Sequence, residues 1–311
     1  MEFIPRNRLL EFKPNTLNFV REQYNLSTPE RINEAIDILE QWIQKQSHFM
    51  KKDFSRDYLE RILIFSKGSV EKAKRRLDKN CTCRSLMPDM FSTSNAKDLI
   101  KEYNHVGKNA VLPKLTDDYY RVYILRNFGQ KFNGFTNYYR LMIMMCEYFQ
   151  AYDYCNGIIA IFDYREANLI EVIKNLDLVE IRQLITIIME GYSFRVKGIH
   201  FITKSRAIDT LVSIVKQGLS EKLAQRIQIH KDPTSLADHM TQDILPFEYG
   251  GKEKSINEMH DELIDELCTN EFMDHLREMK KAQSDESKRQ TDKFNDQYLG
   301  MPGSFRTLSV D

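Results

Sequence analysis

The stretch that decides the fold begins with Gly-Ile-Ile-Ala-Ile-Phe-Asp (157–163) and continues with Tyr-Ser-Phe-Arg-Val-Lys-Gly-Ile-His-Phe-Ile-Thr (192–203). The runs 158–162 and 199–202 have the length and the β-branched content of buried parallel strands. Between them, apolar residues recur at helical spacing, at positions 178, 181, 184, 185 and 188. A strand, a helix and a strand in this order predict a βαβ unit. The chain is therefore expected to have an α/β fold, with a mostly parallel sheet and helices on its faces.

Signals of the same kind extend this prediction along the chain. Thr28 before Pro29 and Glu30 is a good helix start, because it offers a hydroxyl cap, a proline at the first helical position and then an acid. The run Arg226-Ile-Gln-Ile-His230 alternates like the last main strand of a sheet. The other predicted elements are helices over 29–48 and 58–65, a helix that begins at Ser69, a short helix near 95–103, a strand over 120–125, a helix over 137–149, an apolar helix over 207–219 and an acidic helix over 256–268.

Composition and charge limit the number of domains and the kinds of partner that the chain can have. The chain has 311 residues, of which 42% are apolar, enough for one large core and a smaller domain. Lys and Arg balance Asp and Glu at 45 each, so no global field favours nucleic acid as a partner. The charge is uneven, however: region 195–232 has eight basic residues against three acidic ones, and region 252–311 has nine against fourteen.

Three further features predict a cytoplasmic protein. The first ten residues contain two arginines and are not followed by the apolar core of a signal peptide. No apolar run approaches the ~20 residues that a membrane span needs. The five cysteines are odd in number and have no repeated spacing, which is typical of a reduced chain.

Motifs of catalysis are missing from the sequence. It has no Gly-x-Ser-x-Gly elbow, no glycine-rich phosphate loop and no His-Glu-x-x-His. The seven histidines are spread along the chain, and His200, within a strand pattern, is best explained as a structural side chain. Cys81 and Cys83 lack a second pair at zinc spacing. The sequence therefore predicts no catalytic residue, no metal ligand and no cofactor.

Four motifs, in order, resemble the CRAL-TRIO lipid-transfer family, and most of all its branch of alpha-tocopherol transfer protein and cellular retinaldehyde-binding protein. They are Gly157 with Ile161-Phe162-Asp163, then Arg195-Val-Lys-Gly-Ile-His200, Glu221-Lys222-Leu-Ala-Gln-Arg226-Ile and Leu245-Pro-Phe-Glu-Tyr-Gly-Gly251. The resemblance implies a helical N-terminal module over 1–110 and a CRAL-TRIO domain over 111–255. After the CRAL-TRIO domain, the resemblance implies an acidic helix and a flexible tail over 256–311. Asp163 would have a structural role.

The resemblance also implies an apolar pocket under a mobile lid, the helix within 207–219. Met142 and Cys146 stand where the tocopherol carrier has serines, so the loss of hydroxyls favours a less polar ligand than tocopherol. Methionine, being flexible and polarizable, suits an irregular ligand. The implied wall residues are Tyr139, Met142, Ile143, Cys146, Ile158, Phe162, Leu184, Ile187, Ile188, Tyr192, Phe194 and Ile199, with Ile208, Leu211, Val212 and Val215 on the lid.

A basic patch completes the implied site. In the tocopherol carrier, the positions of Arg195, Lys197, Lys222 and Arg226 bind phosphoinositide head groups, and cationic side chains suit phosphate by charge and by number of donors. Lys222 and Arg226 are four apart and are expected on one helical face. Relatives carry arginines before the short helix of the N-terminal module. This chain has Ile-Leu-Ile-Phe-Ser-Lys (62–67) there instead, so the sequence does not decide whether a basic side chain contacts the ligand at this place.

Two hypotheses of function follow. The first is a monomeric, non-enzymatic carrier that binds one hydrophobic ligand of isoprenoid type, such as a retinoid, tocopherol or carotenoid, and docks transiently on anionic phosphoinositide membranes. A phospholipid-transfer protein is a variant of this hypothesis. The second is an adaptor or regulator that keeps the fold but uses its surface and tail to bind another protein. A filled pocket distinguishes the first from the second.

Overall fold

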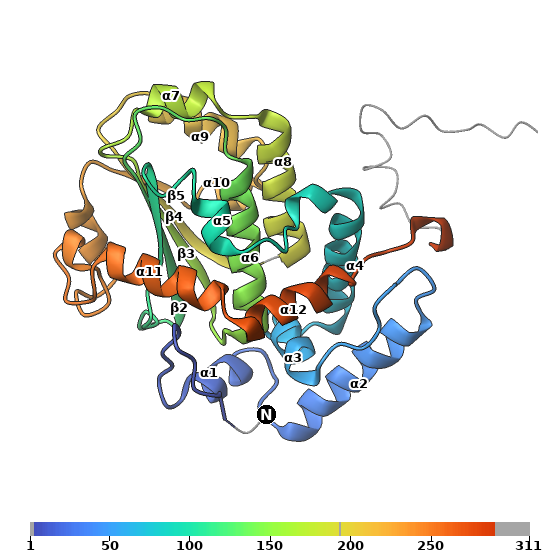
Figure 1. Ribbon diagram of the computed structural model, residues 1–311. Coiled ribbons are helices and arrows are strands. Elements are labelled where there is room, and N and C mark those ends of the chain that lie inside the picture. Colours follow the sequence, from blue (N-terminus) through green and yellow to red (C-terminus); the bar gives the residue numbers. More distant parts are fainter. Residues whose placement is uncertain (1–2, 193, 290–311) are drawn as a thin grey trace, which may run out of the picture.

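The computed structural model describes residues 3–192 and 194–289, and its centre is a sheet of five strands (Figure 1). The strands lie in the order β1 (Gly107–Val111), β2 (Tyr120–Asn127), β3 (Gly157–Asp163), β4 (Val196–Ile202) and β5 (Ile227–His230). β1 is antiparallel to β2, and the other pairs are parallel. The mixed α/β fold with a mostly parallel sheet is therefore confirmed, while β1 was not among the elements predicted from the sequence.

The two faces of the sheet are covered differently. The connecting elements are α6 (Thr136–Tyr152), α7 (Leu169–Lys174), α8 (Leu178–Thr186), the π-helical turn Ile187–Tyr192, α9 (Ile208–Lys216) and α10 (Glu221–Ala224). Because the parallel strands follow one another in sequence order, right-handed crossovers gather these helices on one face. The other face packs against the segment 233–259, with Ile161 and Ile202 opposite Leu236 and Ile244 in one buried cluster.

Two glycines allow close backbone contacts, one between two of the motifs and one within a motif. Gly157 opens β3 at φ 142°, and a Cβ there would lie 2.1 Å from the carbonyl oxygen of Arg195. The next amide, of Ile158, donates to that carbonyl at 2.8 Å. A Cβ on Gly251 would lie 1.9 Å from the carbonyl oxygen of Leu245. Only glycine permits these approaches, which explains its place in the motifs.

The N-terminal helices pack around a hydrophobic core of their own at one end of the molecule (Figure 1). They are α1 (Thr16–Glu22), α2 (Pro29–Lys45), α3 (Arg56–Phe65) and α4 (Val70–Leu86), followed by the 3-10 turn Pro88–Met90 and α5 (Ala96–Ile100). Thr28, Ser55 and Ser69 each cap a helix by accepting a backbone N–H. The four helices predicted for this region are confirmed as α2 to α5; α1 was not predicted.

The C-terminal region is more ordered than the sequence suggested. It contains α11 (Ile256–Leu267), opened by a capping box of Ser255 and Glu258, the unpredicted α12 (Asn270–Lys280) and the 3-10 turn Glu286–Lys288. The start of the predicted tail packs against the fold: the Arg289 guanidinium makes two hydrogen bonds, of 2.9 and 2.8 Å, to the Asp78 carboxylate. The rest of that tail lies outside the described residues.

Short 3-10 turns at Pro233–Asp238 and Phe247–Tyr249 complete the structure. Among the described helices, none has the length and apolar character required to cross a membrane.

Candidate functional site: an apolar cavity under a lid helix and an adjoining basic cleft

A buried polar network fixes helix α6, which forms one wall of the site. The Glu147 carboxylate accepts hydrogen bonds from Arg84 at 2.6 Å and from the Tyr192 hydroxyl at 2.7 Å on one oxygen. Its other oxygen contacts the Tyr58 hydroxyl at 3.2 Å and His275 Nε2 at 2.9 Å. Burial alone raises the pKa of Glu147, but the guanidinium of Arg84 and the hydrogen bond from His275 outweigh it and lower the pKa to about 2. The carboxylate is therefore ionised and anchors α3, α4 and α12 to α6.

A cavity of about 210 Å³ lies between α6, α8, the helix face of the sheet and α9. Eleven of the sixteen side chains predicted to form a pocket line it. They are Tyr139, Met142, Cys146, Ile158, Phe162, Leu184, Ile188, Phe194, Ile199, Leu211 and Val215. The alternation of strand residues and the helical spacing on α6 and α8 bring them together. That these residues bind a ligand stays a prediction.

The other five predicted residues are buried but do not line the cavity. Tyr192 points its hydroxyl into the Glu147 network, and Ile143 lies beside Arg84 and Glu147 at a separate small pocket. Ile187, Ile208 and Val212 belong to the surrounding hydrophobic core. These five residues therefore do not form the cavity wall. Ile187 and Tyr192 lie in a π-helical turn, where α-helical spacing does not tell which way a side chain points.

More than half of the cavity wall was not predicted from the sequence. The missed residues are Tyr123, Leu125, Tyr138, Met145, Phe149, Ala160, Tyr164, Leu176, Ile181, Ile185, Met189, Val196, Phe201 and Leu219. Period-two alternation from Phe162 and Ile199 would have identified Ala160 and Phe201. Helical spacing from Met142 would have identified Met145 and Phe149.

Helix α9 covers the cavity. Leu211 and Val215 face it, whereas Asp209, Ser213 and Lys216 are exposed on the outer side. The far end of the lid touches α8, since a Cβ on Gly218 would lie 2.8 Å from the Cδ1 atom of Ile185. An apolar inner face and a polar outer face are what a lid between an apolar space and water requires.

One polar group at the cavity lacks a partner. The Tyr139 hydroxyl is buried, and no hydrogen-bond partner is found for it among the described residues. The neighbouring Tyr138 hydroxyl, by contrast, lies 2.8 Å from that of Tyr123, which donates to Asn109 at 2.6 Å. Burial raises the pKa of Tyr139, so the group remains a neutral hydroxyl that can bond to a ligand.

A second hollow, of about 780 Å³, separates α3 and α4 from the end of the lid, α10 and the start of β4. Its only acidic residue among the described ones is Glu190, which pairs with Lys79 at 2.8 Å. We name this hollow the basic cleft. Its eight basic residues are Lys67, Lys72, Arg75, Arg76, Lys79, Arg195, Lys222 and Arg226.

Three of the four predicted phosphoinositide residues line the basic cleft. Lys197 does not; it is exposed, and its ammonium lies 3.9 Å from the Asp118 carboxylate. The expectation that Lys222 and Arg226 share a helical face is also wrong, because α10 ends at Ala224, before Arg226. The Arg226 guanidinium donates to the carbonyl of Val196.

Lys67 places a basic side chain in the cleft, at the end of the run 62–67 where the sequence left a basic contact open. It follows α3 in a left-handed backbone conformation (φ 57°) and lines the cleft. Burial and then the positive charges of Arg195 and Lys72 lower its pKa. A cluster of cations that lower one another's pKa favours binding of an anion.

Arg76 is the least compensated charge in the cleft. Its side chain is buried between the rings of Phe65 and Phe194, whose centroids both lie 5.4 Å from the guanidinium carbon. Its two terminal nitrogens find no acceptor in the part of the chain that the structure describes. Burial lowers the pKa of Arg76 to about 9, so the group remains charged at pH 7. A buried cation without an acceptor is costly, and a bound anion would remove that cost.

The cavity and the basic cleft share a wall. Met189, Phe194 and Val196 line both. Met189 belongs to the π-helical turn that ends the α8 segment, and Val196 begins β4. A ligand in one space therefore contacts the same side chains as an anion in the other.

Several other polar side chains have structural roles. Asp163 accepts hydrogen bonds from Arg165 at 2.8 Å and from the Tyr249 hydroxyl at 3.0 Å, which joins two of the motifs. Cys81 and Cys83 are both buried, and burial raises the pKa of each thiol to about 12. Neither cysteine is therefore a ready thiolate ligand for a metal.

Three of the histidines lie close together in the structure, although they are far apart in the sequence. His200, His230 and His239 offer ring nitrogens that lie within 4.8 Å of one another. Burial and then His230 lower the pKa of His200 to about 4, so that His200 is neutral at pH 7.

Two regions of the chain match known families. Residues 105–251 match the CRAL/TRIO domain, and residues 28–99 match the Pinta-like UBA domain. The chain is 26% identical over 232 residues to "Alpha-tocopherol transfer protein-like" of Mus musculus, which covers 72% of this chain and 66% of the relative. It is 28% identical over 236 residues to Clavesin-1 of Xenopus laevis, covering 71% and 70%.

The match thus spans slightly less than two thirds of the mouse relative's own length. Among solved structures, the crystal structure of Sfh5 aligns with a TM-score of 0.48 and 13% identity over 86% of this chain and 98% of that chain. The chain therefore carries a CRAL/TRIO domain over residues 105–251, and the region before it, 28–99, matches a Pinta-like UBA domain.

Proposed function

We propose that this protein is a non-enzymatic carrier that holds one largely apolar molecule under α9 and exchanges it at membranes rich in phosphoinositides. The observation that carries the proposal is the wall shared by the apolar cavity and the basic cleft. A carrier of this kind needs an apolar space for its cargo, an anionic surface to dock on and a contact between the two. The name of the mouse relative, which refers to transfer of alpha-tocopherol, supports the class of activity.

The cargo is inferred to be an isoprenoid-type molecule with one hydrogen-bonding group. The wall is almost entirely apolar, and the Tyr139 hydroxyl is the polar group without a partner among the described residues. Burial of several hundred Å² of ligand surface at about 25 cal/mol per Å² gives on the order of 10 kcal/mol before ordering costs. The volume of about 210 Å³ is below the ~300 Å³ at which drug-sized sites begin, so loading requires the lid to move outward.

Docking is attributed to the basic cleft. Each surface cation near an anionic membrane contributes about 1 kcal/mol, and phosphate groups accept hydrogen bonds from Arg and Lys. The buried guanidinium of Arg76 favours a head group whose phosphate enters the cleft over a purely superficial contact.

Exposed apolar side chains lie near the lid and would add to docking. Ile170 on α7 is 57% exposed, and Leu178 and Val179 at the start of α8 are 59% and 63% exposed. α7 packs against the lid α9, and both lie at the end of the molecule opposite α1 and α2 (Figure 1). Such side chains favour insertion into the headgroup layer.

Extraction and mass spectrometry test the cargo. The protein is incubated with vesicles that contain mixed lipids, retinoids and tocopherols, re-isolated and extracted with organic solvent. We expect one enriched apolar compound near one per chain, and a phospholipid in that role would identify a phospholipid-transfer protein instead. Ile188→Glu, at the cavity wall, should abolish loading, whereas the matched Ile229→Glu on the exposed edge strand should not. An empty cavity in the unmodified protein would favour the adaptor hypothesis.

Vesicle binding tests the basic cleft. The double variant Lys67→Ala/Lys222→Ala removes two cations that line it and should weaken binding to phosphatidylinositol-bisphosphate vesicles by about 2 kcal/mol, or about thirtyfold. Lys197→Ala is the control, because it removes one cation outside the cleft. We expect the control to weaken binding equally for phosphoinositide vesicles and for phosphatidylserine vesicles of the same charge. If the double variant shows the same equality, the cleft is not the head-group site.

A further inference from the structure

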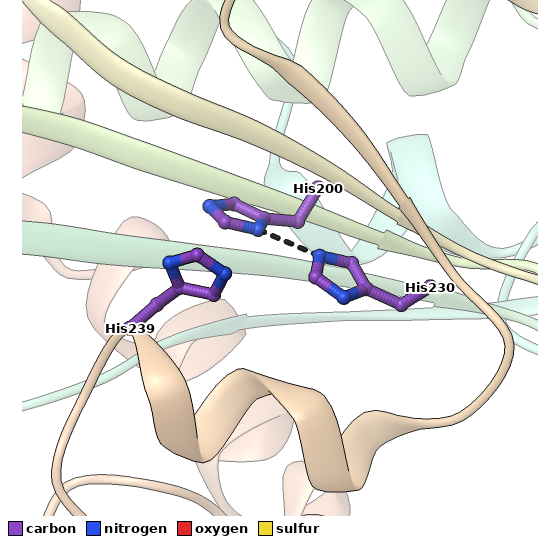
Figure 2. Close-up of side chains that lie close together, drawn as sticks. All are labelled: His200, His230 and His239. Carbon is purple, nitrogen blue, oxygen red and sulfur yellow. Dashed lines mark hydrogen bonds between the residues drawn. The ribbon is translucent and has the colours of Figure 1, made fainter.

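Three histidines meet on the face of the sheet opposite the cavity (Figure 2). His200 lies in β4 between Ile199 and Phe201, which face the cavity, so its ring points to the other side. His230 ends β5, and His239 follows the 3-10 turn Pro233–Asp238. His200 Nδ1 lies 2.9 Å from His230 Nε2. One nitrogen of each ring lies within 4.8 Å of the others.

We propose that His200, His230 and His239 form a binding site for a divalent transition-metal ion of the zinc class. Imidazole nitrogen is a preferred ligand of zinc, copper and nickel, and three histidines with one open position form a known type of zinc site. This inference is independent of the proposed carrier function, since the cavity lies across the sheet. It also differs from the sequence-based prediction of no metal ligand. That prediction followed from the spacing, because gaps of thirty and nine residues between the three histidines match no known metal motif.

The distances require only small movements. With zinc–nitrogen bonds of about 2.0–2.1 Å in tetrahedral geometry, ligand nitrogens lie about 3.3 Å apart. The His200–His230 contact would lengthen by about 0.4 Å on that basis. His239 would approach the other two rings; it is exposed and lies just beyond a 3-10 turn, where side-chain rotation meets little resistance.

A second layer of hydrogen bonds prepares His230 as a ligand. The Ser235 hydroxyl donates to the carbonyl of Asp232 at 3.2 Å. Its oxygen is therefore free to accept from His230 Nδ1, 2.7 Å away. A proton on Nδ1 leaves the lone pair of Nε2 directed at the cluster. Metal-bound histidines are oriented in this way by their second nitrogen.

Gly198 orients the ring of His200. A Cβ on Gly198 would lie 2.7 Å from His200 Nε2, so this nitrogen lies close over the strand backbone. Nδ1 is consequently the nitrogen that faces His230. Any larger side chain at position 198 would push the ring out of this position.

An ion in this place would join three segments at the edge of the sheet. β5 is an edge strand of only four residues, and Ile229 within it is 47% exposed. His200, His230 and His239 come from β4, from β5 and from the segment after it. A bound ion would therefore stabilise the edge of the sheet, with water in the fourth position.

The test uses the full chain with any affinity tag removed and with metal stripped by a chelator. Zn²⁺ is titrated by calorimetry, Co²⁺ binding is followed by its visible absorption, and the melting temperature is measured with and without Zn²⁺. We expect one ion per chain and a rise in melting temperature. His239→Ala should weaken Zn²⁺ binding at least tenfold and remove the rise, whereas His105→Ala, which removes another exposed histidine, should change neither.

A conservative variant separates coordination from a structural effect. His239→Cys keeps a ligand at the same place and should restore Zn²⁺ binding, with a cobalt–thiolate charge-transfer band that the unmodified protein lacks. The proposal is overturned if Zn²⁺ does not bind at 1:1, if His239→Ala binds it as tightly as the unmodified protein, or if His239→Cys shows no such band.

Discussion

At the scale of single residues, the Glu147 carboxylate is the group on which most of the packing depends. It is 1% exposed, yet it receives hydrogen bonds from α4, from the π-helical turn and from α3, and it contacts α12. Removing it would leave the Arg84 guanidinium buried without its counter-ion.

Glu147→Ala should therefore lower the free energy of unfolding by about 3–5 kcal/mol, the usual cost of breaking a buried ion pair from one side. Urea unfolding followed by circular dichroism measures it. Glu262→Ala is the matched control, because that carboxylate is 47% exposed in its pair with Lys254 and its loss should cost less than about 1 kcal/mol. Equal losses in the two variants would contradict the central role of Glu147.

The positions of individual side chains in the site were harder to predict from the sequence than the helices and strands. The family resemblance placed Met142 and Phe162 at the cavity, and the structure agrees because both lie on regular elements, α6 and β3, where a position in the motif also sets the direction of the side chain. Lys67 and Arg76 could not be predicted in the cleft, since the two walls of this hollow come from segments more than one hundred residues apart in the chain. Nothing in a local pattern reports which distant charges face one another.

At the scale of elements, the contact between the end of the lid and α8 should control how easily α9 opens. The contact is tight at Gly218, where a Cβ would approach Ile185 Cδ1 to 2.8 Å and Cγ2 to 2.9 Å. The lid end can therefore close on α8 only while position 218 has no side chain.

Gly218→Ala should hold the lid end away from α8. Crowding of this size costs about 1 kcal/mol, which corresponds to about fivefold faster release of a bound fluorescent retinoid to acceptor vesicles. The double variant Gly218→Ala/Ile185→Ala relieves the crowding and should return release toward the original rate. Release that is unchanged in the single variant would mean that the lid does not open at this end.

Elements were predicted well where apolar periodicity was strong and poorly where it was not. α2, α6 and β3 have clear patterns and were found. β1 is a short edge strand with Lys108 and Asn109 in its middle, so it lacks the apolar run of a buried strand. α12 was missed because its charged residues hide the stripe of Phe272, Met273, Leu276 and Met279.

At the scale of the whole molecule, buried neutral groups make stability depend on pH. His260 is 1% exposed, and its Nδ1 accepts the backbone N–H of Asn109 at 3.1 Å. Burial and then Lys108 lower the pKa of His260 to about 4, against about 6.5 in an unfolded chain. Between these values the unfolded chain binds a proton that the folded chain does not, so stability falls as the pH falls.

The free energy of unfolding should therefore be at its full value above pH 6.5 and decrease from pH 6.5 to pH 4, with His260 contributing up to about 1.4 kcal/mol per pH unit. Unfolding by urea at several pH values measures the slope. His260→Gln should flatten it, while His105→Gln, at an exposed position, should leave it as it is. An equal slope in His260→Gln would show that other groups dominate.

Met189, in the wall between the cavity and the basic cleft, makes the protein sensitive to oxidants. Peroxide converts a methionine thioether into a polar sulfoxide, and methionine sulfoxide reductases reverse the reaction. One added oxygen atom at this position would disturb the apolar wall and the anion-binding wall together. Under the proposed function, oxidation of this one residue would weaken cargo binding and membrane docking together, and enzymatic reduction of the sulfoxide would restore both.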